Sequence, residues 1–263
     1  MSSPQERSRW SIEAKERLIA IVSPVALLLA WQLLSWLKVF DARFIPSPLT
    51  IFDGAVVLVR SGELWTHLSA SLWRLLWGFL LGAIPGIAIG LVMGLSRYVR
   101  AALDPIVSAT YPIPKIAILP LVMLYFGIGE FSKIVIIAIA VIYLVLINTM
   151  VGVMSIEPIY FDVARNFNAP WRKLFTRVII PGALPLIFAG LRLSLGVSLI
   201  VIVSAEFIAA KSGIGFLIWT SWETLVIENM FVGIIVITVL GVVSTLILKE
   251  IEQLLIPWRR DRN

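Results

Sequence analysis

The sequence contains no cysteine and a single histidine, His67, among its 263 residues. Without cysteine the chain has no disulfide, no thiolate nucleophile and no iron–sulfur site, and a lone histidine does not supply a histidine-based metal centre. The sequence also offers no Ser/His/Asp set or metal cluster that would provide a nucleophile or a Lewis acid. These absences argue against an enzyme.

A Gly-Lys dipeptide is also missing. The chain therefore cannot contain the G-x-x-x-x-G-K-[ST] loop that cradles nucleotide phosphates, so it is not its own ATPase of that type. Charged residues make up only 14% of the chain, and the 22 Lys and Arg residues are not gathered on one soluble face among aromatics. This distribution argues against nucleic-acid binding.

Apolar residues are abundant instead, because 59% of the chain is hydrophobic and the mean hydropathy is +0.97. Six apolar runs each approach the roughly 20 residues that cross the ~30 Å hydrocarbon core of a bilayer. They are residues 19–37, 72–95, 103–126, 133–153, 186–210 and 226–249. The first run is longer than a signal-peptide core and is not followed by a small-residue cleavage site. We therefore predict an all-α, polytopic membrane protein with about six transmembrane helices.

Lysine and arginine cluster in alternate segments outside these runs. Most lie in the tail 1–18, in the second and fourth loops and in the tail 250–263. By the positive-inside rule, we expect both termini and the loop 155–185, between spans four and five, in the cytoplasm. Residues 19–71 then form the first transmembrane helix and an external loop with an interfacial helix at 48–60. The core transmembrane domain is 72–249, and His67 is expected in a solvated helix before its first span.

The loop 155–185 is long for a connection between spans. Pro158 and Pro170 suit the first turn of a helix, and Asn168 between them suits a left-handed stop. We therefore predict two short helices joined by a sharp corner. Charged residues such as Arg172 alternate there with aromatic residues such as Trp171. This combination is typical of a docking surface for a soluble partner.

The second span carries a glycine at every fourth position. These residues are Gly78, Gly82, Gly86, Gly90 and Gly94. Residues four apart lie on one face of a helix, so the ladder forms a groove that another backbone can approach closely. The groove serves either tight packing within the subunit or a gliding surface for a helix that shifts during transport.

Polar residues inside the later spans are few. Four prolines break the third span, and Lys115 within it lies either along a cavity or near the cytoplasmic interface. In the fifth span, Glu206 and Ser204 are candidates for a translocation path or an outer gate. Glu206 could instead be a helix-end carboxylate that is solvated or paired with Lys211. Arg192 is about 21 Å away along a straight helix and cannot pair with Glu206.

Several short motifs along the chain are informative when they are taken together. An acidic residue, an alanine and a turn residue occur as Asp162, Ala164 and Asn168, followed by an apolar run that ends at Pro181. Further motifs are PSP at 46–48, SLWR at 71–74, YPIPKIAILP at 111–120, FGIG at 126–129 and SGIG at 212–215. Together they resemble the permease subunits of bacterial binding-protein-dependent ABC importers, in the subfamily that serves aliphatic sulfonates, taurine and nitrate.

This resemblance implies a function and a set of partners. The loop 155–185 would be the coupling loop that docks on an ATPase. Its coupling residues would be Asp162, Ala164, Arg165, Asn168, Ala169, Trp171 and Arg172. The chain itself would hold no cofactor, since ATP and Mg would bind to the partner. The expected partners in the bacterial inner membrane are lipid, a second identical permease subunit, a cytoplasmic ABC ATPase dimer and a periplasmic or lipid-anchored solute-binding protein.

The substrate implied is an aliphatic sulfonate, taurine or a nitrate-like anion, and alternatives remain open. Relatives with the same plan import pyrimidine vitamin precursors, riboflavin or bicarbonate. A stand-alone secondary transporter or channel would belong to a different class. The scarcity of intramembrane carboxylates and the absence of a convincing inverted repeat argue against that class.

Overall fold

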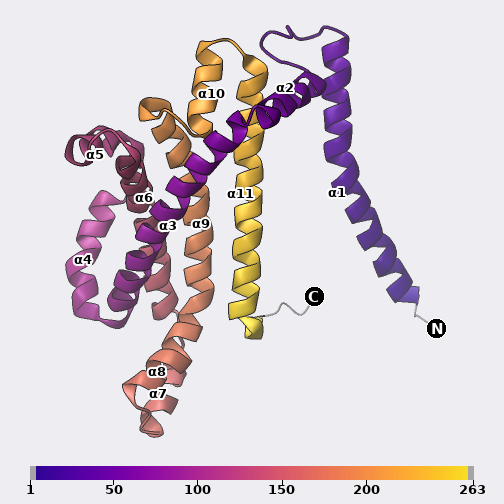
Figure 1. Cartoon of the computed structure of the whole chain (residues 1–263). Coiled ribbons are helices and arrows are strands. Elements are labelled where there is room, and N and C mark those ends of the chain that lie inside the picture. The colour runs from indigo at the N-terminus through magenta and orange to yellow at the C-terminus, as the bar shows by residue number, and fades with distance from the viewer. Residues whose placement is uncertain (1–3, 260–263) are drawn as a thin grey trace.

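The computed structural model describes residues 4–259, and this part of the chain is helical without strands (Figure 1). The first half comprises α1 (Pro4–Trp36), α2 (Pro48–Arg60), α3 (Glu63–Leu95), α4 (Arg97–Thr110), the 3₁₀ turn η1 (Lys115–Ile118), α5 (Leu119–Phe126) and α6 (Glu130–Met154). The second half comprises α7 (Pro158–Asn166), α8 (Trp171–Leu174), the π-helical turn η2 (Phe175–Ile179), α9 (Ile180–Ala209), α10 (Ile214–Glu223), α11 (Ile227–Leu255) and η3 (Pro257–Arg259).

The helices that can cross a membrane agree with the expected spans. Five are long and apolar enough, and they include most of α1, all of α3, α6 and α11, and the continuous stretch Trp171–Ile208. A sixth span is obtained if α4 and the η1–α5 segment count as one, although these two parts are bent by 87°. The break falls at Pro112 and Pro114, where missing N–H groups interrupt the helix.

The ends of the chain differ from the expected boundaries. α1 begins at Pro4, so most of the tail 1–18 continues the first helix. α11 runs to Leu255, and η3 follows it within the tail 250–263. Residues 1–3 and 260–263 lie outside the described part of the chain. α2 spans 48–60, the bounds expected for the interfacial helix.

Three long helices, α3, α6 and α9, form the centre of the molecule. The glycine ladder of α3 faces α6: a Cβ atom on Gly82 would lie 2.5 Å from the carbonyl oxygen of Ala138, and one on Gly90 2.6 Å from that of Leu146. Only glycine permits this approach of the two backbones. Around the contact, Ile136 of α6 and Ile202 of α9 belong to one buried apolar cluster.

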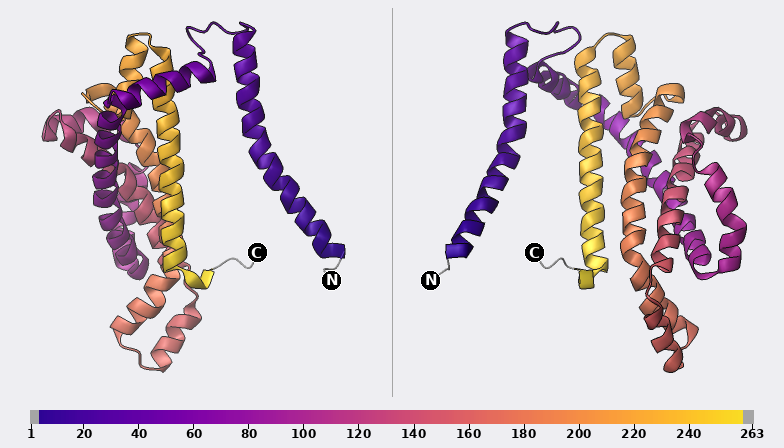
Figure 2. Two further views of the ribbon diagram at one scale, coloured as in Figure 1. Left: turned by 45° about the vertical axis from the view of Figure 1, so that its right-hand side comes forward. Right: turned by 180° about the vertical axis from the view of Figure 1, so that it is seen from behind.

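The remaining helices surround this centre unevenly. α1 leans away from the other helices, and its C-terminal end joins them where Leu49 N–H donates to Gln32 Oε1 (3.2 Å) and Trp31 lies beside Phe231 (Figure 2). α1 starts and α11 ends at the same end of the molecule, and α7 and α8 project beyond that end (Figure 1). The fold therefore gathers both ends of the chain and the long loop on one side.

Candidate functional sites

The long loop forms a hairpin of two short helices, α7 and α8, which we call the coupling hairpin (residues 158–174). α7 ends in a Schellman motif: Ala169 N–H donates to Ala164 O (2.9 Å) and Asn168 N–H donates to Arg165 O (3.0 Å). Asn168 has φ +49°, in the left-handed region. The predicted corner and its residue are therefore confirmed.

The apolar residues of the loop divide into two groups. Phe161, Leu174 and Phe175 pack against a cluster formed by Val153 of α6 and residues of η2 and α9, of which Ile179 is fully buried. Phe167 and Trp171 point outward and are 81% and 61% exposed. The first group anchors the hairpin to the membrane helices, and the second leaves an apolar surface for a partner.

Charged residues surround that apolar surface. Asp162 and Arg165 form an exposed ion pair of 3.5 Å on α7, and Arg172 is exposed on α8. Ala164 and Ala169 are half-buried. All seven of the expected coupling residues thus lie on one hairpin of about 17 residues.

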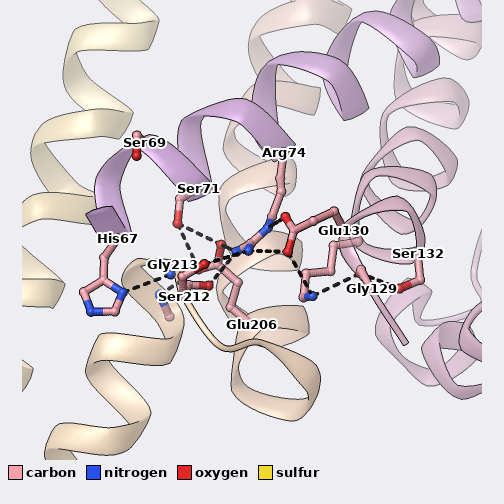
Figure 3. A network of polar contacts seen from close by, with 12 residues as sticks. His67, Ser69, Ser71, Arg74, Gly129, Glu130, Ser132, Glu206, Ser212 and Gly213 are labelled. Atoms are coloured by element: carbon pink, nitrogen blue, oxygen red, sulfur yellow. Dashed lines mark hydrogen bonds and ion pairs between the residues drawn. The ribbon is translucent and has the colours of Figure 1, made fainter. Parts of the chain in front are cut away.

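A second polar site lies near the opposite end of the molecule, and we call it the Arg74 cluster (Figure 3). It comprises Ser71, Arg74, Glu130, Lys133, Glu206 and Ser212. All five N–H groups of the Arg74 guanidinium donate: two to Glu130, one to Glu206 and two to Ser212. Arg74 and Glu206 are fully buried, whereas the side chain of Glu130 is 57% exposed. This cluster joins α3, α6 and α9 to the loop before α10.

The first turn of α10 is fixed by side chains of α3 and α9. His67 Nδ1 accepts the N–H of Gly213 (3.1 Å), Ser71 Oγ accepts that of Ile214 (2.8 Å) and Glu206 Oε2 accepts that of Gly215 (2.8 Å). A helix start leaves N–H groups without helical partners. A carboxylate there accepts such a hydrogen bond and also interacts favourably with the positive end of the helix dipole. A Cβ atom on Gly213 would collide with the Glu206 carboxylate, so the SGIG motif makes room for this cap.

Two expectations for this region were wrong. His67 is not solvated: it is 7% exposed and buried against the start of α10. It is held there because its ring accepts the N–H of Gly213. Glu206 is neither solvated nor paired with Lys211, because Arg74 lies 2.7 Å from its carboxylate inside the bundle. Arg192 was expected not to pair with Glu206, and it pairs instead with Glu252 of α11.

Arg74 and Glu130 form a pair that was not predicted from the sequence. Arg74 closes the SLWR motif, and Glu130 directly follows the FGIG motif. Charged residues that flank such motifs in apolar surroundings were the available signal, since a charge inside a membrane segment requires a partner. Ser204, by contrast, stays outside the cluster and donates to Ile200 O within α9 (2.9 Å).

Lys115 occupies the break between α4 and η1. Its ammonium donates to Thr110 O and Tyr111 O, both at 2.9 Å, and lies 4.2 Å from the centre of the Tyr143 ring. Tyr143 stands near the middle of the 25-residue α6. Lys115 therefore lies at mid-depth in the helix bundle, away from the end that carries the coupling hairpin.

A cavity of about 300 Å³ lies at the base of the coupling hairpin, where the chain leaves α6 and returns through η2. It is lined by Ser155, Ile156, Glu157, Tyr160, Arg177, Val178, Pro181, Gly182 and Trp258. The cavity brings the C-terminal segment beside the root of the hairpin. In the described residues there is no group of histidines, cysteines and carboxylates that could hold a metal ion.

Comparisons with known proteins agree with this arrangement. Residues 86–260 match the family model described as "Binding-protein-dependent transport system inner membrane component". The chain is 34% identical over 258 residues to the taurine transport system permease protein of Escherichia coli K12, covering 96% of this chain and 94% of the relative. It is 38% identical over 235 residues to a putative aliphatic sulfonates transport permease of the same organism, covering 89% of each.

A solved structure has a similar fold. It is described as an amino acid ABC transporter with histidines, and it superposes with a TM-score of 0.55 over 77% of this chain and 96% of that one. The sequence identity is 18%, so the likeness concerns the fold alone.

Proposed function

Because this chain belongs to the family of binding-protein-dependent transport system inner membrane components, we propose that it forms the membrane path of an ABC importer for taurine or another aliphatic sulfonate. The chain is a permease subunit. The substrate assignment is supported by the relatives named for taurine and aliphatic sulfonates, whose matches cover most of both chains.

The coupling hairpin is the observation that carries this proposal. It is a projection with exposed aromatic and cationic residues, anchored to α6 and α9 through buried Ile179. Exposed aromatic and arginine residues are common anchors in protein interfaces. We assign its partner as a cytoplasmic ABC ATPase dimer, in which ATP and Mg bind.

The proposed ATPase partner is cytoplasmic, and this determines how the permease is oriented in the inner membrane. The coupling hairpin and both ends of the chain lie on one side, and that side is the cytoplasm because it meets the ATPase. The opposite side, with α2 and α10, receives substrate from a periplasmic or lipid-anchored solute-binding protein. A second identical permease subunit completes the translocation path, and membrane lipid covers the remaining apolar surface.

The cycle follows from these contacts. ATP binding closes the ATPase dimer and moves the coupling hairpin with it. Phe161, Leu174 and Phe175 pass this movement to α6 and α9, with which they share a buried cluster. The paired subunits then change from inward-facing to outward-facing, and hydrolysis resets them.

The proposal is tested by transport in reconstituted vesicles. The permease is purified with its cognate ATPase, inserted into liposomes and supplied with the binding protein, and uptake of radiolabelled taurine is measured. We expect uptake that requires both ATP and the binding protein. Uptake driven by an ion gradient without ATP would contradict the importer. Uptake of nitrate or riboflavin with none of taurine would overturn the substrate assignment.

A further inference from the structure

Lys115 is a cation at mid-depth whose charge is not balanced by the part of the chain that the structure describes. Its ammonium has two carbonyl acceptors and an aromatic ring, and it forms no ion pair with a carboxylate of the described residues. Carbonyl groups satisfy hydrogen bonds but do not neutralise a full charge. A charge held at this depth is costly unless an anion or water reaches it.

Three other cations of the spans contrast with Lys115. Arg74 is paired with Glu130 and Glu206, Lys133 lies 3.7 Å from Glu130, and Arg192 is paired with Glu252. The same fold thus provides carboxylates for these cations. An ammonium has three N–H donors, and two of those of Lys115 are used. The third remains for a ligand.

The surroundings of Lys115 leave it approachable. The side chain is half-buried, and neighbouring Tyr111 and Ile113 are 45% and 44% exposed. α4 has no buried residue, and with α5 it forms the flank of the molecule that lies farthest from α11 and α1 (Figure 1). This flank is therefore available to a second subunit and to the path between the two.

We propose that Lys115 forms a transient binding site for the anionic group of the substrate in the translocation path. The sulfonate oxygens accept the third N–H of the ammonium and balance its charge. One cation with carbonyl groups already bound gives a weak site, and a weak site suits transport because the substrate must also leave. The inference rests on the proposed function, since it requires an anionic substrate.

Removing the charge tests this site. We compare the wild-type complex with Lys115→Met, Lys115→Arg and the control Lys249→Met, whose lysine is exposed at the end of α11. Initial rates of taurine uptake, binding-protein-stimulated ATPase activity and thermal unfolding are measured for each. We expect Lys115→Met to lower uptake by about tenfold or more, the scale of losing one buried charge partner. ATPase activity and unfolding temperature should stay at the wild-type values.

The comparisons separate a binding role from a structural one. Lys115→Arg should restore most of the uptake, and Lys249→Met should match the wild type. If Lys115→Met lowers the unfolding temperature and ATPase activity together with uptake, Lys115 only holds the end of α4 and the inference is wrong. Wild-type uptake by Lys115→Met would also overturn it. A wild-type complex that transports neither taurine nor another aliphatic sulfonate would instead contradict the proposed function.

Discussion

The molecule holds charge inside the membrane in two different ways. In the Arg74 cluster, Arg74 and Lys133 face Glu130 and Glu206, and every donor of the guanidinium has an acceptor. At the α4–η1 break, Lys115 has carbonyl groups and an aromatic ring but no carboxylate among the described residues. The closed cluster stabilises the fold, and the open cation remains available to a substrate.

Packing differs between the two regions in the same way. The Arg74 cluster lies among α3, α6 and α9, where the glycine ladder brings backbones into contact. The α4–η1–α5 segment is bent, and α4 buries none of its residues, whereas Leu119 and Val122 of α5 belong to the central buried cluster. A closely packed centre beside the loosely packed α4 is suited to a transporter, since one part must hold its shape while another changes.

The largest effect is expected from opening the closed cluster. Arg74→Leu leaves the buried carboxylate of Glu206 without its cation, and removal of one partner of a buried pair typically costs about 3–5 kcal/mol. We expect loss of stably folded protein, measured as yield and thermal unfolding in detergent. Glu130→Gln should be milder, because the side chain of Glu130 is 57% exposed. Equal unfolding temperatures for wild type and Arg74→Leu would contradict the role of the cluster.

The rigid centre is tested by filling the glycine ladder. Gly82→Ala places a methyl group 2.5 Å from the carbonyl oxygen of Ala138, and overpacking of this kind costs about 1–3 kcal/mol. At Gly86 the nearest atom is 3.0 Å away, so Gly86→Ala should destabilise less. Gly196→Ala is the control, because nothing lies within 4 Å of its added atom. The order of unfolding temperatures checks the prediction, and three equal values would refute it.

A smaller effect is expected at the corner of the coupling hairpin. Asn168 has φ +49°, and a β-branched residue there is disfavoured by about 1–2 kcal/mol. Asn168→Val should therefore misalign α8 and reduce ATP-driven uptake, while thermal unfolding of the membrane helices changes little. Asn168→Gly tolerates the same backbone and should keep wild-type uptake. If the two variants transport equally well, the corner geometry is not important for coupling.

The smallest effect is expected at an exposed ion pair in the loop after α1. Hydrogen bonds from Arg43 lower the pKa of Asp41 from 3.8 to about 2. A lowered carboxylate pKa gives a contribution that is complete above pH 3.8 and lost as the pH falls toward 2. Both side chains are exposed, so screening by solvent makes the contribution small. Arg43→Ala should unfold like the wild type at pH 8 and at pH 5, and a clear drop at either would contradict this.

Local features were the ones that the sequence predicted well. Apolar runs located the spans, and Asn168 located the corner of the coupling hairpin. Of the four prolines expected to break the third span, Pro112 and Pro114 fall at the break, whereas Pro105 lies inside α4 and Pro120 in the first turn of α5. Each depends on neighbouring residues and on backbone conformations that side chains restrict. The resemblance to ABC importer permeases of the sulfonate, taurine and nitrate subfamily was confirmed as well.

Contacts between distant segments were not predictable in this way. Glu206 was expected either to line a translocation path or outer gate, or to be solvated or paired with Lys211, whereas its partner Arg74 lies 132 positions away. His67 was expected in a solvated helix, but it accepts the N–H of Gly213 from a distant loop. Such partners depend on how the helices pack against one another, and this packing could not be read from the sequence pattern alone.

We propose that this permease receives ATP-driven movement through the coupling hairpin. Ala164→Arg tests this most directly, because it introduces a long, charged side chain at a half-buried position of α7. Binding-protein-stimulated ATPase activity and taurine uptake are measured in vesicles, with thermal unfolding as the control for folding. We expect both activities to be lost while the unfolding temperature is unchanged. Wild-type values for both activities would show that the hairpin is not the docking element.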